Sequence, residues 1–228
     1  MPRLTGLIEA SETNLFGTGR HLNFRWKSGL IKTVLISYTE PWMLGKPISL
    51  GGKYEQIKRQ NQTSVKMSKE KSADLTISAR FNPMLKGTLT ASLKRIGLLE
   101  IGASEELDRI KYGVAFSVIR DSRDFFLSPT RGRRDHLAFE ISRGDFKLRK
   151  LWIDLDQYAK TWKNQVILAG VHIASAWGQD IPWTEMFSLG GANSLRGYDE
   201  DFFFGQHRLY CNIEYRLLVG HISQVFSF

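Results

Sequence analysis

The chain has a single cysteine, Cys211, among its 228 residues. One cysteine excludes an intrachain disulfide and any zinc site built from several cysteines, so the redox compartment cannot be inferred from cysteine pairing. There is also no run of about eighteen apolar residues, which excludes a membrane-spanning helix but not a membrane-spanning strand. The first residues, MPRL, lack the basic segment and apolar core of a signal peptide.

Catalytic motifs are also missing. The sequence contains no G-x-S-x-G nucleophile elbow and no H-E-x-x-H zinc motif, and its five histidines stand on separate predicted strands. Asp154 and Asp156 lie two residues apart on one strand face, which suits a glycosidase but is equally tolerated in a water-filled barrel. We therefore predict that the chain is not an enzyme, binds no metal and needs no cofactor.

The net charge of +9 raises the question of a nucleic-acid partner. Basic clusters at residues 66–71 and 131–134 lie where predicted strands begin, however, and not along one helix. Such clusters are usually solvated, and the alternative is contact with anionic lipid headgroups. We expect membrane lipids as partners and no nucleic acid.

Two-residue alternation of apolar and polar side chains is the main positive feature. In residues 21–27, Leu22, Phe24 and Trp26 fall on one face, opposite polar and basic side chains on the other. The polar face carries charges of both signs, which suits either the solvent face of a β-sandwich or the wet interior of a barrel. The same split recurs at residues 74–81, 136–142, 151–156 and 210–217.

Strand length favours the barrel. Most candidate strands reach the ~9–11 residues that a tilted strand needs to cross a bilayer, whereas sandwich strands are typically ~5–6 residues long. No linker or second domain is apparent, so the predicted fold is one all-β unit, a transmembrane antiparallel up-and-down β-barrel. The candidate strands are residues 3–12, 19–28, 31–40, 47–59, 66–81, 87–98, 110–121, 134–144, 146–158, 164–177, 207–218 and 221–228.

Aromatic residues gather toward the ends of these strands. A membrane barrel places such residues in girdles at the two interfaces, and ordinary packing is the alternative explanation. The girdle candidates are Trp42, Phe125, Phe126, Tyr158, Trp162, Trp177 and Trp183.

The most distinctive stretch is FSLGGANSLRGY at residues 187–198. Gly190, Gly191 and Gly197 permit an unusual compact loop, in which Arg196 is a lone cation. Neither the P-loop pattern nor a following helix is present, so a phosphate-binding loop is excluded. On the strand at 207–218, Glu214 lies on the polar face.

Residues 187–198 resemble the GG…SLRG(Y/F) loop of the BamA/TamA superfamily of outer-membrane assembly and secretion barrels. NLFGTG at 14–19, YTEPW at 38–42, and RDSRD with PTRG across 120–132 resemble further elements of that family in the same order. Members form sixteen-stranded barrels whose arginine loop folds into the lumen between the eleventh and twelfth strands. The NLFGTG turn joins the second and third strands, so the candidate strand at 164–177 is the eleventh.

The resemblance implies that residues 1–228 form a partial barrel domain with about twelve of the sixteen strands. On this count the first strand, the last three strands and the periplasmic POTRA domains lie outside the chain. We therefore expect the sequence to be a fragment whose natural N-terminus lies elsewhere.

The resemblance also assigns a site. The family's loop arginine, here Arg196, forms a salt bridge with acids on the inner wall, here Glu214 and a second acid beyond Phe228. Since a guanidinium matches a carboxylate in bidentate fashion, we interpret this contact as a structural pin. The alternatives are an exposed loop arginine and a solvated glutamate. Around the arginine, the predicted loop motif comprises Gly190, Gly191, Ser194, Leu195, Gly197 and Tyr198, with Tyr198 packing the loop.

The function implied is outer-membrane protein assembly and insertion, or protein translocation, in a Gram-negative-type bacterium. Partners would be outer-membrane lipids, client outer-membrane or secreted proteins, and periplasmic accessory proteins bound through POTRA domains. A seam between the first and last strands could template a client strand, but both strands lie outside the chain. Alternatives are a two-partner secretion pore, the anchor of a passenger such as a patatin-like lipase, and a soluble β-sandwich binding module.

Overall fold

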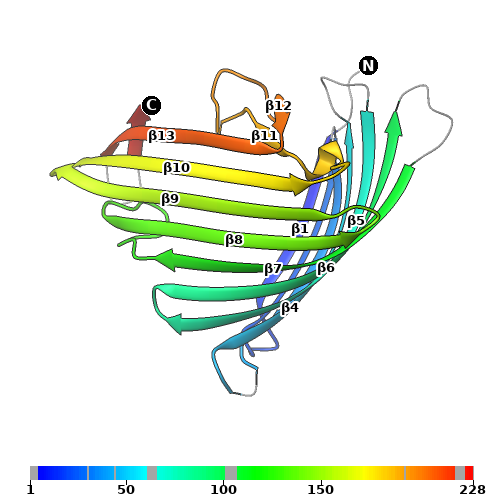
Figure 1. Ribbon diagram of the computed structural model, residues 1–228. Helices are drawn as coiled ribbons and strands as arrows, with labels where there is room; N and C mark the ends of the chain where they lie inside the picture. Colours follow the sequence, from blue (N-terminus) through cyan, green and yellow to red (C-terminus); the bar gives the residue numbers. More distant parts are fainter. Residues whose placement is uncertain are drawn as a thin grey trace.

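The computed structural model describes residues 5–29, 31–43, 45–60, 66–100, 107–192, 194–218 and 224–227. Its main element is one antiparallel sheet of twelve strands, in the order β1 to β10, β13, β14. Figure 1 shows this sheet curling around an interior. The strands are β1 Gly6–Leu15, β2 Arg20–Ser28, β3 Lys32–Glu40, β4 Ile48–Gln60, β5 Lys66–Asn82, β6 Leu85–Glu100, β7 Leu107–Asp121, β8 Gly132–Gly144, β9 Leu148–Trp162, β10 Gln165–Gly178, β11 Phe187–Leu189, β12 Phe203–Gly205, β13 His207–Leu218 and β14 Gln224–Ser227, with a 3-10 helix, η1, at Trp183–Glu185.

This architecture confirms the predicted all-β, antiparallel, up-and-down fold. Among the described residues the other sheet is the two-stranded pair of β11 and β12, which is too small to form the second layer of a sandwich, so the sandwich alternative is wrong. The edge strands β1 and β14 do not pair with each other within the described ranges. Over the same ranges, no helix has both the length and the apolar character needed to span a membrane.

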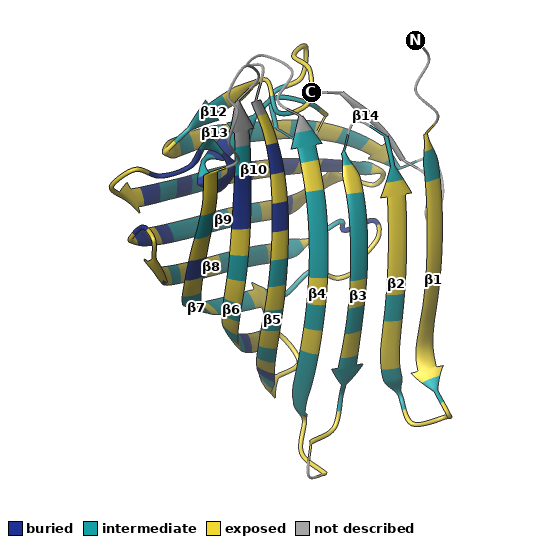
Figure 2. Cartoon of the chain, turned by 90° about the vertical axis from the view of Figure 1, so that its right-hand side faces the viewer, coloured by how far each residue is buried: buried dark blue, intermediate teal, exposed yellow. Residues whose placement is uncertain are grey.

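Alternation gives the sheet two chemically different faces, and Figure 2 shows the accompanying alternation of more and less exposed residues along the strands. On the convex face of β2, Leu22, Phe24 and Trp26 are each more than a third exposed. On the opposite face Arg25 pairs with Glu9 of β1 at 2.7 Å. Comparable apolar residues line the convex face of the other long strands, and so large an exposed apolar surface requires an apolar environment to cover it. A slip of one residue in any pairing would turn these side chains inward.

The two ends of the sheet also differ. We call the end that carries the connection between β10 and β13 the loop end, and the opposite end, which carries the tight turn at residues 16–19, the turn end. At ~3.3 Å per residue, the 17 residues of β5 exceed what a bilayer-crossing strand needs. The outward residues of β5 are apolar from Ala73 to Phe81 and basic at Lys69 and Lys71, so this strand runs past the apolar zone at the loop end.

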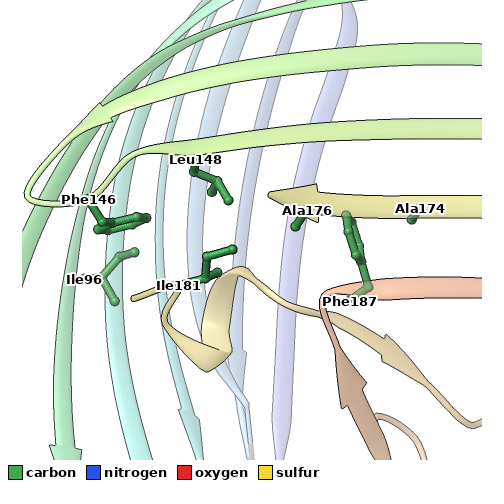
Figure 3. Packing of buried hydrophobic residues seen from close by; sticks show 7 residues of the cluster. All are labelled: Ile96, Phe146, Leu148, Ala174, Ala176, Ile181 and Phe187. Atoms are coloured by element: carbon green, nitrogen blue, oxygen red, sulfur yellow. The ribbon is translucent and has the colours of Figure 1, made fainter. Parts of the chain in front are cut away.

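The buried core lies on the inner face near the loop end. Ile96, Leu148 and Ala176 of the strands are almost fully buried there by Ile181 and Phe187 of the β10–β13 connection. Figure 3 shows these side chains converging where the connection folds back onto the wall. The core is therefore made by the loop filling the interior, not by a second layer of sheet.

Most predicted strand bounds lie within three residues of those in the structure. The first strand runs three residues later than predicted, and residues 3–4, 221–223 and 228 of the predictions lie outside the described residues. The short strands β11 and β12 and η1 were not predicted. Two of the aromatic girdle assignments are wrong. Tyr158 is buried on the inner face under Arg216, and Trp183 packs against Phe204 inside the loop.

Candidate functional site

The predicted motif closes a small hairpin within the β10–β13 connection. β11 pairs with β12 through Phe187 and Gly205 at its base, and the motif follows β11 directly. Gly190 has φ +134°, and a Cβ there would lie 2.4 Å from the carbonyl oxygen of Asp199, so only glycine fits. The Ser194 hydroxyl accepts from the amide of Gly190 at 3.0 Å and donates to its carbonyl at 2.9 Å.

Arg196 lies near Glu214, with 3.7 Å between its Nη2 and the carboxylate Oε1. The approach is through one nitrogen, not the two of a bidentate pair, and Arg196 Nε instead donates to the carbonyl of Ala192 at 3.1 Å. The other oxygen of Glu214 accepts from Arg216 at 2.8 Å. Arg196 is 40% exposed whereas Glu214 is 14% exposed, so solvent screens this contact.

The remaining motif residues lie beside this contact. Leu195 is half-buried, and Gly191 and Gly197 both have φ +89°. The ring of Tyr198 lies 5.4 Å from that of Phe202 and 5.1 Å from that of Phe203, and all three rings are substantially exposed. Tyr198 thus packs within its own loop. Asn193, within the motif, lies outside the described residues.

A second anchor of the loop was not predicted. Glu185, at the end of η1, is 2% exposed and contacts three lysines of the inner wall. Its carboxylate lies 2.9 Å from Lys94 Nζ, 2.8 Å from Lys111 Nζ and 2.6 Å from Lys150 Nζ. These lysines belong to β6, β7 and β9. One loop carboxylate therefore joins three strands of the wall.

The three lysines and Glu185, which we call the lysine cluster, belong to a wider network. Lys94 also pairs with Glu70 at 2.6 Å, and Lys111 with Glu140 at 2.8 Å. Burial alone would raise the pKa of Glu185, but attraction from Lys94, Lys150 and Lys111 outweighs it and holds that pKa below its ordinary value. Glu185 is consequently ionised whenever the loop is seated. A polar cavity of about 300 Å³ borders the cluster.

A weak signal for this cluster was present in the sequence. Lys94, Lys111 and Lys150 all fall on polar strand faces close to the loop end. What the sequence could not supply was the path of the β10–β13 connection, which brings Glu185 onto them from 35 or more residues away.

Two of the histidines meet on the inner wall. The carboxylate of Asp154 lies 3.0 Å from His136 Nδ1 and 2.9 Å from His172 Nδ1. The ring of His172 stacks on that of Tyr210, with 4.5 Å between the ring centroids. His172 Nε2 also lies 3.6 Å from Asp156. The two histidines stand on separate strands, β8 and β10, as predicted. Among the described residues, no group of three or more His, Cys, Asp or Glu side chains has the arrangement of a metal site.

The RDSRD and PTRG elements form one turn at the turn end. The carboxylate of Asp124 accepts from the amides of Phe125, Thr130 and Arg131 at 2.9, 2.9 and 3.1 Å, and from the Thr130 hydroxyl. Partial burial opposes ionisation, but these hydrogen bonds dominate and lower the pKa of Asp124 to about 2. The two elements are thus parts of one closed connection between β7 and β8.

The sequence profile of the Omp85 superfamily domain matches residues 14–208, which is most of the chain and includes all four recognised elements. The chain belongs to the Omp85 superfamily. The predicted resemblance is confirmed, since the BamA/TamA proteins belong to this superfamily.

Solved structures support the barrel fold. BamA from Haemophilus ducreyi, in a structure lacking POTRA domains 1–3, matches 95% of this Omp85 chain with a TM-score of 0.84 and 16% identity. CdiB from Acinetobacter baumannii matches 93% with a TM-score of 0.65 and 17% identity. The chain spans 51% of that BamA chain and 43% of that CdiB chain. No curated protein sequence matches it.

Proposed function

We propose that this chain is barrel wall and lumen loop of an outer-membrane protein that assembles or translocates client proteins in a Gram-negative-type bacterium. The observation that carries the proposal is the Omp85 domain together with a loop held inside the barrel by ion pairs at both of its halves. The apolar convex face would contact lipid, and client outer-membrane or secreted proteins would be the substrates. We propose no catalytic step and no cofactor.

The loop has two attachments of different strength. Glu185 is buried among three lysines, and the pair of Arg196 and Glu214 is partly exposed. A buried ion pair is costly to break by removing one partner, whereas an exposed pair contributes little. We infer that the lysine cluster fixes the base of the loop, while Arg196 positions the tip against β13.

The two attachments give the motif residues a structural role. Gly190 and Ser194 shape the turn that places Arg196 near β13, and the hydrogen bond from Arg216 orients the Glu214 carboxylate. A seated loop fills the interior near the loop end, and a released loop would leave that space to water or a client segment. The position of the loop therefore determines whether the loop itself fills the interior near the loop end.

The proposal includes parts of the protein beyond this chain. Strands that complete the barrel, and periplasmic POTRA domains that recruit clients or accessory proteins, would belong to the full-length protein. An open sheet edge in lipid leaves backbone N–H and C=O groups without partners, which is strongly unfavourable. Closure by further strands would remove that cost.

The first experiment uses the full reading frame that contains this chain, expressed in outer membranes. We expect detergent-dependent extraction and heat-modifiable migration on gels. Purified protein in liposomes should then accelerate insertion of an unfolded β-barrel client. The Glu185→Gln variant should insert the client more slowly than wild type. Glu200→Gln is the control, because Glu200 carries the same charge on the same loop. Equal rates with and without the protein would refute assembly.

A two-partner secretion pore is the second candidate, favoured by the similarity of the fold to CdiB. It predicts that the full-length protein exports one secreted partner encoded with it and leaves β-barrel insertion unaffected. Deleting the protein in its host distinguishes the two. Loss of many outer-membrane barrels supports assembly, and loss of one secreted protein supports secretion.

A further inference from the structure

The convex face changes from apolar to basic at the loop end of four neighbouring strands. Lys32 of β3, Lys58 of β4, Lys69 and Lys71 of β5, and Arg95 of β6 are all exposed there. We call these five residues the basic patch.

The register of the sheet brings the patch together. Lys58 is directly opposite Lys32 on one side and Lys69 on the other, so three lysines form a row across three strands. In the next row Lys71 is directly opposite Arg95. Neighbouring strands are ~4.8 Å apart, and like charges directly opposite one another destabilise a sheet. Such a grouping is unfavourable unless something anionic lies over it.

The described residues supply little compensating charge. Arg95 pairs with Asp108 of β7, and the charge of Asp108 also attracts Lys69 and Lys71. Within the described parts of the chain, none of the four lysines forms an ion pair with a carboxylate. This differs from the inner face, where Lys94 and Lys111 are each paired with two carboxylates. The patch therefore presents a net positive surface outward.

The patch lies where lipid headgroups would be. One step toward the turn end, the outward residues become apolar or aromatic, with Tyr54, Leu93 and Tyr112 all more than 40% exposed. Tyr54 lies directly opposite Ala73, which is one outward position from Lys71 along β5, and Leu93 is one from Arg95 along β6. Tyrosines beneath a layer of lysine and arginine are typical of a membrane interface, where long basic side chains reach into the headgroups.

We propose that the basic patch binds the phosphate groups of an anionic lipid in the leaflet at the loop end. The row from β3 to β6 spans three strand spacings, ~14 Å, which accommodates two phosphates. The geometry favours a diphosphorylated glycolipid of the lipid A type. This inference rests on the membrane placement in the proposed function and goes beyond it, since neither client handling nor the loop requires such a site.

The test measures binding of diphosphoryl lipid A to the full-length protein in neutral detergent by native mass spectrometry. The variant is Lys58→Gln with Lys69→Gln and Lys71→Gln. The matched control is Lys46→Gln with Arg120→Gln and Lys163→Gln, which removes the same charge from exposed positions at the turn end. We expect about tenfold or greater weakening for the patch variant, because each basic residue near an anionic surface adds to binding. The control should bind as wild type, and equal affinity of patch variant and wild type would overturn the site.

Further measurements separate the ligand sources. Dephosphorylated lipid A should bind patch variant and wild type equally, and inorganic phosphate at millimolar concentration should not displace the lipid. Displacement by phosphate alone would make the ligand a free anion and overturn the lipid assignment. Heat-modifiable migration reports separately on the membrane fold. Should the triple variant fail to fold, Lys58→Gln alone must weaken binding about threefold and Lys58→Arg must preserve it, or the proposal is wrong.

Discussion

Replacing Glu185 by glutamine should unseat the lumen loop. Glutamine keeps the shape of the side chain but removes the charge that three lysines surround at 2.6 to 2.9 Å. Lys94 and Lys111 would retain Glu70 and Glu140. Lys150, whose side chain is 10% exposed, would keep no ion pair among the described residues.

The expected magnitude follows from that single uncompensated charge. Breaking a buried pair by removing one partner costs ~3–5 kcal/mol. Two of the lysines keep a partner and a polar cavity borders the site, so the lower end, ~3 kcal/mol, is expected. For a domain of this size that lowers the unfolding temperature by roughly 6–12 °C.

The assay is thermal loss of the compact, heat-modifiable form of the full-length protein, together with protease cleavage within residues 179–206. Glu185→Gln should unfold earlier and be cleaved faster, and Glu200→Gln should behave as wild type. Lys150→Met in the Glu185→Gln background should recover more than half of the lost stability, since Lys150 Nζ already lies over the rings of Trp152 and Phe187. Wild-type stability and cleavage of Glu185→Gln would refute the anchoring role.

Other predictions test the remaining contacts. Arg196→Ala should lower stability by less than about 1 kcal/mol because its pair with Glu214 is exposed. Glu214→Gln should lower stability more, since Arg216 is 13% exposed and loses its partner. Urea unfolding measures both losses, and a larger loss for Arg196→Ala would contradict the geometry. Gly190→Ala should destabilise the loop by ~2 kcal/mol or more, through φ +134° and a clash with Asp199, and Gly197→Ala by only ~1 kcal/mol, because nothing lies within 4 Å of its Cβ position; equal effects on protease cleavage would exclude the clash. Asp124→Ala should cost ~1–2 kcal/mol by removing the acceptor of three amides, with the exposed Asp199→Ala as control. The stabilising effect of Glu185 is present above its ordinary pKa and is lost as pH falls below it, so the difference between wild type and Glu185→Gln should shrink on acidification below about pH 4; a constant difference in melting temperature down to pH 3 would be inconsistent with this.

The strands could be predicted from the sequence because each strand is specified by its own local pattern of residues. Alternation such as Leu22, Phe24 and Trp26 against Arg25 specifies both a strand and the face it presents. Turn residues then limit each strand, as the glycines at 17 and 19 do with positive φ. A predicted bound was wrong where the strand continues beyond the predicted end, as in β9, which ends at Trp162 and not at residue 158.

The interior could be predicted only in part because it depends on contacts between distant residues. The motif gave Arg196 and Glu214 through a resemblance, not through the physics of either residue. The lysine cluster required knowing that η1 folds onto β6, β7 and β9, and the meeting of His136 with His172 required the register of β8, β9 and β10. Tyr158 was misplaced because an aromatic near a strand end can face either side, and its even position on β9 turns it inward.

The central claim is that the convex face contacts lipid and the concave face does not, and Cys211 offers the most direct test. Cys211 is exposed on the convex face of β13, and Asn212 is its neighbour on the inner face. In full-length protein from outer membranes, with other cysteines replaced, a polarity-sensitive fluorophore at Cys211 should emit at shorter wavelength and be quenched by nitroxide-labelled lipid. The same fluorophore on Asn212→Cys in a Cys211→Ser background should be quenched by a water-soluble agent instead. Water-like emission at both positions, with no quenching by lipid, would contradict the barrel.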